Sequence, residues 1–166
     1  MSSNPANEPG RAAPAMPYGV LVIDDQRAVR EGLARLIACS PVPMVCVGTA
    51  ATGAEALTAN ARLHPDVILL DVDLAGEDGL ALIPQLAQRA GILVLTSHGD
   101  AATRARAAAL GALAFVEKHE PATELLRAIV RTCHLQSGGE KGPGAQGTTS
   151  PPPLVASSAA RPRPAP

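Results

Sequence analysis

Short apolar runs alternate along the chain with longer segments in which apolar and polar residues recur at helical spacing. Five such runs are rich in Val, Ile and Leu: "GVLVID" (19–24), "MVCVG" (44–48), "DVILLD" (66–71), "ILVLT" (92–96) and "ALAFV" (112–116). Their composition predicts strands. Because helical segments separate the five runs, we expect the strands to form a parallel sheet.

The segments between the runs predict helices. Apolar residues share one face of the first and last segments, at Val29, Leu33, Leu36 and Ile37 and at Leu125, Leu126, Ile129 and Cys133. The segments "TGAEALTANARLH", "GLALIPQLAQRA" and "DAATRARAAALG" precede the third, fourth and fifth strands, and Pro84 is expected in the first turn or two of its helix. This alternation predicts an α/β fold: a single doubly wound five-stranded parallel sheet in the flavodoxin-like order 2-1-3-4-5, with helices on both faces.

Composition divides the 166 residues into one folded unit and two tails. Residues 1–17 are rich in Pro, Ala and Asn, and residues 137–166 are rich in Gly, Pro and Ser. Such segments cannot bury enough apolar area to offset the entropy of ordering. We therefore predict disorder at both ends and a folded domain over 18–136.

Charge and cysteine content exclude several classes of function. Fourteen basic and fifteen acidic residues give a net charge of −1, which supports no general nucleic-acid-binding surface. Cys39, Cys46 and Cys133 lie far apart, without metal-ligand spacing, and are predicted to be small buried hydrophobic residues. Since the sequence shows neither a signal segment nor an apolar run of membrane-spanning length, we expect a cytoplasmic protein.

Chemically reactive side chains follow four of the predicted strands. Asp24 and Asp25 end the first strand, Asp71 ends the third, Thr96 ends the fourth, and Lys118 follows the fifth. In a doubly wound sheet, ligands bind beyond the carboxyl ends of the strands. We therefore expect these five side chains to face one crevice.

Three carboxylates in one crevice require positive charge. Two carboxylates about 4 Å apart at intermediate dielectric repel by roughly 4 kcal/mol, and the whole stability of a domain is only about 5–15 kcal/mol. Mg²⁺, which takes oxygen ligands and often binds carboxylates together with a phosphate, fits this need, and Lys118 supplies a second positive charge. This set suits attack by Asp71 on phosphorus to form an aspartyl phosphate, with the Thr96 hydroxyl donating to the phosphoryl group.

Over residues 20–133 the sequence resembles the receiver domain of two-component response regulators. The matching stretches are "VLVIDDQRAVREGLARLI", "PDVILLDVDLAGEDGLALI", "ILVLTS" and "GALAFVEK". "VREGL" and "ELLRAI" also resemble the LuxR-like branch, but no helix-turn-helix output domain follows the last helix. In one departure, Ala75 stands where the family usually has Pro.

The resemblance implies a role for each matching residue. Asp71 matches the phosphoacceptor, Asp25 the direct Mg²⁺ ligand, Asp24 a partner that acts largely through water, and Asp73 the residue whose backbone carbonyl completes the metal site. Thr96 and Lys118 match the two residues that contact the phosphoryl group, and Phe115 matches the aromatic residue that reorients when the hydroxyl moves. As an isolated aromatic on a strand, Phe115 also fits a core position.

The resemblance also implies partners. A sensor histidine kinase or a phosphotransfer protein would donate to Asp71, and an unidentified downstream protein would bind the modified face, while a phosphorylation-dependent dimer stays open. The chain would be no independent enzyme, since it would promote only its own Mg²⁺-dependent phosphorylation and dephosphorylation. We expect no direct binding of nucleic acid or membrane. The alanine-rich helix over 100–110 should dock shallowly and supply the moving part.

Two alternatives remain. "LLDVDLAG" also fits a haloacid-dehalogenase-like phosphohydrolase, although in that family the nucleophile strand comes first and an acidic metal pair lies downstream, whereas Asp24 and Asp25 precede Asp71. The chain could instead be a docking module that keeps the fold without being phosphorylated. The intact set of acidic residues, Thr96 and Lys118 argues against this second alternative.

Overall fold

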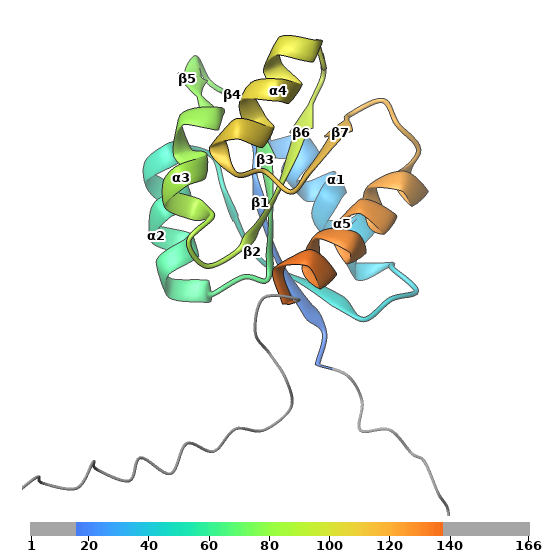
Figure 1. The fold of residues 1–166 in the computed structure, drawn as a ribbon. Helices are drawn as coiled ribbons and strands as arrows, with labels where there is room; N and C mark the ends of the chain where they lie inside the picture. Colours follow the sequence, from blue (N-terminus) through green and yellow to red (C-terminus); the bar gives the residue numbers. More distant parts are fainter. Residues whose placement is uncertain (1–15, 138–166) are drawn as a thin grey trace, which may run out of the picture.

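The computed structural model describes residues 16–137, in which a five-stranded parallel sheet has the predicted order, here β2-β1-β3-β6-β7 (Figure 1). Apart from residues 16, 17 and 137, the two predicted tails lie outside the described residues. The strands are β1 (Tyr18–Ile23), β2 (Met44–Ala50), β3 (Val67–Asp71), β6 (Gly91–Thr96) and β7 (Ala114–Glu117).

Helices cover both faces of the sheet, as the sequence predicts. The helices are α1 (Arg27–Ala38), α2 (Gly53–Leu63), α3 (Ile83–Leu86), α4 (Ala101–Leu110) and α5 (Ala122–Ser137). Figure 1 shows α2, α3 and α4 on one face and α1 with α5 on the other. In β1, Leu21 and Ile23 pack toward the first group while Val20 and Val22 pack toward the second, because successive side chains of a strand point to opposite faces.

The predicted helix over 79–90 is wrong in length. A 3-10 turn, η1 (Gly79–Leu82), precedes a single α-helical turn, and the chain leaves the helix after Leu86. Pro84 lies in the first turn of α3, as expected. It lacks an N–H for the backbone bond that would join the two segments into one helix, so a tighter turn leads into α3.

A short hairpin after β3 was not predicted. Strands β4 (Asp73–Leu74) and β5 (Glu77–Asp78) pair antiparallel across a two-residue turn at Ala75 and Gly76. Their φ angles are 54° and 87°, so both residues are in the left-handed region that the tight turns of hairpins favour. The alanine adopts this conformation without the freedom of a glycine.

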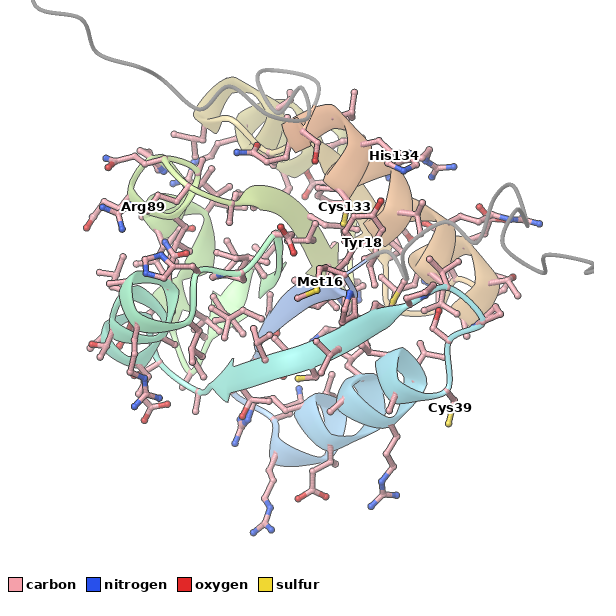
Figure 2. The ribbon with its side chains drawn as sticks, turned by 90° about the horizontal axis from the view of Figure 1, so that it is seen from below. Met16, Tyr18, Cys39, Arg89, Cys133 and His134 are labelled. Carbon is pink, nitrogen blue, oxygen red and sulfur yellow. The ribbon has the colours of Figure 1, made fainter. Side chains whose placement is uncertain are left out.

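The cysteines differ from one another, so the prediction of three buried thiols is partly wrong. Cys133 on α5 is buried, Cys46 is half-buried, and Cys39, at the edge of the molecule in Figure 2, is exposed. Cys39 caps the carboxyl end of α1, where the chain turns through solvent toward β2. Within residues 16–137, no helix combines the length and apolar character needed to cross a membrane.

The two ends of the described chain lie at the amino end of the sheet (Figure 1). Tyr18, which begins β1, contacts His134 of α5 edge to face, with 6.2 Å between the ring centroids (Figure 2). The carboxyl ends of the strands, where the predicted site lies, are therefore at the opposite end of the domain.

Candidate functional site

Three carboxylates meet at the carboxyl ends of two neighbouring strands. Asp24 and Asp25 directly follow β1, and Asp71 is the last residue of β3, which pairs with β1. One oxygen from each of the three carboxylates lies within 4.8 Å of those of the other two. The structure thus brings together the three acidic side chains that the sequence places at separate strand ends.

The ammonium group of Lys118 lies between two of these carboxylates. It donates to Asp24 Oδ2 at 2.6 Å and to Asp71 Oδ2 at 2.8 Å. The exposed fractions of the three side chains are 16% for Lys118, 1% for Asp24 and 8% for Asp71. Since charges so far from water are costly unless they are paired, Lys118 is required to offset the two aspartates.

Burial and charge oppose one another in the pKa values of this group. Burial raises the pKa of Asp71 above its ordinary value, and the hydrogen bond and charge of Lys118 act against that rise. Burial alone would lower the pKa of Lys118, but its hydrogen bonds to Asp24 and Asp71 and their charges raise it overall. Lys118 therefore stays a cation at neutral pH and favours the ionised form of Asp71.

Asp24 and Asp25 are held very differently. The Asp24 backbone N–H donates to the Ala50 carbonyl at 3.1 Å, and Asp24 Oδ1 accepts from the Gln26 N–H at 2.8 Å. Asp25 is the most exposed of the three acids, and its carboxylate accepts no hydrogen bond from any residue that the structure describes. Asp24 is fixed, whereas the Asp25 carboxylate is available to a ligand.

The donor set suits a small hard cation. Three carboxylates offer oxygen ligands only, which is what Mg²⁺ prefers, and the Asp25 carboxylate would bind it without breaking a protein hydrogen bond. Asp73 begins β4, and a hydrogen bond from its backbone N–H slightly opposes the rise in the pKa of Asp71 that burial causes. The role predicted for the Asp73 carbonyl stays a prediction.

Thr96 and Phe115 lie on the two strands beyond β3. Thr96 is buried at the end of β6, and its hydroxyl donates to the His98 carbonyl at 3.2 Å and accepts from the His98 N–H at 3.3 Å. The hydroxyl therefore binds the loop after β6 rather than Asp71. Phe115 on β7 is half-buried against the core beneath α4, so its core interpretation and its switch interpretation both remain.

Sequence reasoning missed two residues that support the site. The Gly79 N–H donates to the Val72 carbonyl at 2.8 Å, and a Cβ on Gly79 would lie 2.1 Å from the Asp71 carbonyl oxygen. Arg30 of α1 binds the backbone that carries Asp24 and Asp25. A glycine in the loop that follows Asp71 and an arginine near the beginning of a helix were the only signals in the sequence.

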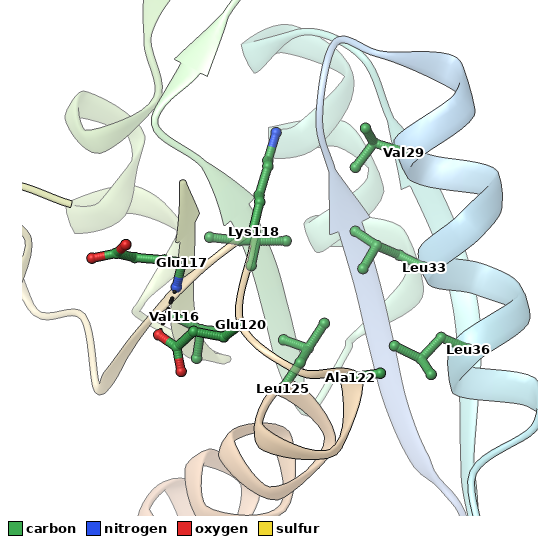
Figure 3. Close-up of a pocket in the computed structure, with 10 residues that line it drawn as sticks. Val29, Leu33, Leu36, Val116, Glu117, Lys118, Glu120, Ala122 and Leu125 are labelled. Carbon is green, nitrogen blue, oxygen red and sulfur yellow. Dashed lines mark hydrogen bonds between the residues drawn. The ribbon is translucent and has the colours of Figure 1, made fainter. Parts of the chain in front are cut away.

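An apolar pocket of about 250 Å³ lies beside the site, between α1 and the segment that joins β7 to α5. Val29, Leu33 and Leu36 of α1 face Ala122 and Leu125 across it (Figure 3). Figure 3 also shows the Lys118 side chain extending away from Leu125, past the carboxyl end of β1. The ammonium group of Lys118 therefore binds the carboxylates, while the apolar part of the Lys118 side chain lines the pocket.

Comparisons with known proteins agree with this geometry. Residues 20–130 match the family model described as the response regulator receiver domain. The chain is 33% identical over 136 residues to the positive alginate biosynthesis regulatory protein of Pseudomonas aeruginosa, covering 80% of this chain and 55% of that protein. The chain spans about half the length of this and several other curated relatives, among them transcriptional regulatory proteins of Bacillus subtilis.

Two solved structures share both fold and sequence with the chain. One is the signal receiver domain of the putative response regulator NarL from Mycobacterium tuberculosis, with a TM-score of 0.67 and 30% identity over 72% of this chain and 98% of that one. The other is a LuxR-family two-component response regulator from Aurantimonas sp. SI85-9A1, with a TM-score of 0.67 and 30% identity over 71% of this chain and 86% of that one. Both agree with the branch that "VREGL" and "ELLRAI" indicate.

Proposed function

The chain belongs to the response regulator receiver domain family, and from this premise we propose that it accepts a phosphoryl group on Asp71 and thereby switches a partner-binding surface in a phosphorelay. The donor is a sensor histidine kinase or a phosphotransfer protein, the partner that a receiver domain of a two-component system implies. One observation carries the proposal: the Lys118 ammonium group bridges Asp71 and Asp24, beside an Asp25 carboxylate that has no partner among the described residues.

The chemistry follows from these contacts. A carboxylate oxygen of Asp71 attacks phosphorus, and the bond between phosphorus and the donor atom breaks, so the leaving group keeps the electron pair of that bond. Lys118 already donates to Asp71, and it would stabilise the charge that develops on the phosphoryl oxygens. Hydrolysis of the acyl phosphate by water restores the carboxylate. The chain is then a phosphoacceptor that promotes only its own phosphorylation and dephosphorylation.

Magnesium is part of this proposal. The carboxylates of Asp24, Asp25 and Asp71, together with the backbone carbonyl of Asp73, would hold Mg²⁺. When bound, the ion supplies positive charge that offsets the negative charge of the phosphoryl group. The role of Asp24 and Asp25 is to keep that charge close to Asp71.

The switch would begin at Thr96. Among the described residues its hydroxyl bonds to the backbone of His98 alone, so it can exchange this partner for a phosphoryl oxygen without breaking a bond to another side chain. The loop after β6 leads into α4, of which only Ala107 is buried. A helix with so little buried area is easily displaced, and Phe115, which packs beneath it, would follow. The downstream protein would recognise the displaced face, and a cytoplasmic location belongs to the same proposal.

The proposal is tested by incubation of the chain with acetyl phosphate and Mg²⁺, followed by measurement of the intact mass. We expect a phosphoryl adduct that is lost in Asp71→Asn and retained in Asp78→Asn, which changes an exposed acid on the nearby hairpin. An adduct that persists in Asp71→Asn would contradict the assignment of Asp71. No adduct with any phosphoryl donor would favour the docking module.

A further inference from the structure

Arg30 makes two hydrogen bonds to the loop that carries the acidic pair. Its Nη1 donates to the Asp24 carbonyl at 2.7 Å and to the Asp25 carbonyl at 2.9 Å. The residue is half-buried and is the fourth residue of α1, at the end of its first turn. Helical side chains lean toward the amino end of their helix, so the guanidinium group reaches back over the residues that precede α1.

The position of Arg30 is unfavourable for the helix itself. The positive end of the helix dipole lies at the amino end of α1, where acidic rather than basic residues stabilise a helix. The first turn of α1 contains no acidic residue, and the cap residue Gln26 makes no side-chain capping bond. A cation at this place is therefore explained by what it binds outside the helix, which is the backbone of the acidic pair.

Asp25 depends on this contact more than Asp24 does. Asp24 is also held through its own N–H, by Gln26 and by Lys118. Within residues 16–137, the bond from Arg30 to the Asp25 carbonyl is the one side-chain hydrogen bond that Asp25 receives. The bond to the carbonyl holds the peptide plane that follows Asp25, and with it the backbone position from which the Asp25 side chain extends.

We propose that Arg30 is a positioning residue for the metal site, which holds the Asp24–Asp25 backbone so that the Asp25 carboxylate is ready to bind Mg²⁺. This inference rests on the proposed function, since it concerns the same site. The two bonds of Arg30 go to backbone carbonyls, so it would act on the cation only through the acidic pair. Its contribution is that Asp25 is ordered before the ion binds.

Simple electrostatics and positioning predict opposite results when Arg30 is changed. If Arg30 acted only through its charge, removal of a cation near a dication site would tighten Mg²⁺ binding. If it orders Asp25, its removal weakens binding, and loss of a supporting residue around a metal site typically costs about 10-fold or more in affinity. The sign of the change in affinity therefore distinguishes the two.

The experiment is a calorimetric titration of the full chain with Mg²⁺, in wild type, Arg30→Gln and Arg35→Gln. Arg35 lies on the same helix, is exposed, and controls for the loss of one positive charge. We expect about 10-fold weaker binding in Arg30→Gln, unchanged binding in Arg35→Gln, and faster amide exchange at Gln26 in metal-free Arg30→Gln. Unchanged or tighter binding in Arg30→Gln would overturn the inference.

Two further measurements keep the result interpretable. If Arg30→Gln does not fold, Arg30→Lys keeps the charge but replaces the guanidinium fork by a single ammonium group, and it too must bind Mg²⁺ more weakly than wild type. Failure of the proposed function is distinct, because wild type itself would then bind no Mg²⁺ and form no adduct with acetyl phosphate. If only the role of Arg30 is wrong, wild type still binds Mg²⁺ and still forms the adduct with acetyl phosphate.

Discussion

The guanidinium group of Arg104 lies over the ring of Phe115, with 4.3 Å between Arg104 Cζ and the ring centroid. Arg104 Nη2 also pairs with Glu117 Oε1 at 3.4 Å, so one side chain of α4 holds two residues of β7. Since only Ala107 of α4 is buried, the contact between α4 and β7 depends strongly on this arginine. The side chain that flanks the proposed switch residue therefore also holds the proposed moving helix.

Arg104→Gln should loosen α4. A cation over an aromatic ring at an exposed site contributes about 0.5–1 kcal/mol, so we expect the free energy of unfolding in urea to fall by about that amount. Amide exchange should accelerate in α4 but not in α5. Arg89→Gln, which removes an exposed arginine elsewhere, is the control. Equal α4 exchange rates in wild type and Arg104→Gln would show that the stack does not hold the helix.

The sheet was predictable because its evidence is local. The apolar runs around Val22, Leu69 and Val94 are strands that need cover on both faces, and the strand order follows from alternation with helices. The meeting of Asp24, Asp25, Asp71 and Lys118 follows in turn, because the carboxyl ends of parallel strands share one edge. Here the position of each residue at the end of a strand determines which side chains meet.

The supporting contacts could not be predicted in the same way. These contacts depend on side-chain directions and backbone angles. They are the bonds from Arg30 to two carbonyls, the stacking of Arg104 on Phe115, and the close approach of Gly79 to the Asp71 carbonyl, where a Cβ would lie 2.1 Å from the oxygen. The hairpin after β3 was missed because Ala75 has a positive φ angle, which alanine rarely adopts. No pattern of apolar and polar residues encodes such details.

The pair between Arg106 and Asp78 should add a small, acid-sensitive contribution to stability. The hydrogen bond from Arg106 lowers the pKa of Asp78, so the folded state holds the carboxylate more strongly than the unfolded chain does. That stability is present above the unfolded pKa of about 3.9 and is lost as the pH falls through the lower folded pKa.

Unfolding of wild type and Arg106→Gln at a series of pH values measures this contribution. The two side chains are 54% and 43% exposed, so solvent screens the pair and we expect a difference of about 0.2–1 kcal/mol at pH 7. The difference should shrink as the pH falls below the unfolded pKa of Asp78 and through its lower folded pKa, and it should also shrink in high salt. A difference that persists at low pH would assign the effect to packing of the arginine stem.

Ala75→Gly should stabilise the domain. A left-handed conformation costs an L-residue with a Cβ about 1–2 kcal/mol, part of which the greater freedom of an unfolded glycine cancels. We expect a net gain of about 0.5–1 kcal/mol in the free energy of unfolding. Ala61→Gly on α2 should instead lose about 1 kcal/mol, as for glycine inside a helix. If both variants lost stability equally, Ala75 would not be strained.

The three thiols should react at very different rates. Burial raises the pKa of Cys133 to about 12, so at pH 8 only about one molecule in ten thousand carries its thiolate. Burial also raises the pKa of the half-buried Cys46, whereas Cys39 is exposed. A chromogenic disulfide reagent should show one fast thiol, and Cys39→Ser should remove the fast phase. A fast phase that survives in Cys39→Ser would mean that Cys46 or Cys133 is more accessible than its burial indicates.

Gly79→Ala should damage both the fold and the proposed phosphoacceptor, Asp71. The new Cβ would lie 2.1 Å from the Asp71 carbonyl oxygen, and two backbone segments joined by the bond from the Gly79 N–H to Val72 would have to separate. Overpacking of this kind costs about 1–3 kcal/mol, which urea unfolding would detect. Because the displaced carbonyl belongs to Asp71, labelling by acetyl phosphate should slow even under conditions in which the variant is fully folded.

Gly32→Ala is the matched control for that variant. Gly32 lies in α1, and a Cβ there would meet no atom within 4 Å, so alanine should stabilise the helix by about 0.5–1 kcal/mol and leave the rate of labelling unchanged. The two variants therefore distinguish the steric effect of a Cβ next to the Asp71 carbonyl from the general effect of replacing a flexible glycine. If Gly79→Ala matched wild type in both stability and labelling, the contact between Gly79 and Asp71 would not constrain the proposed phosphoacceptor.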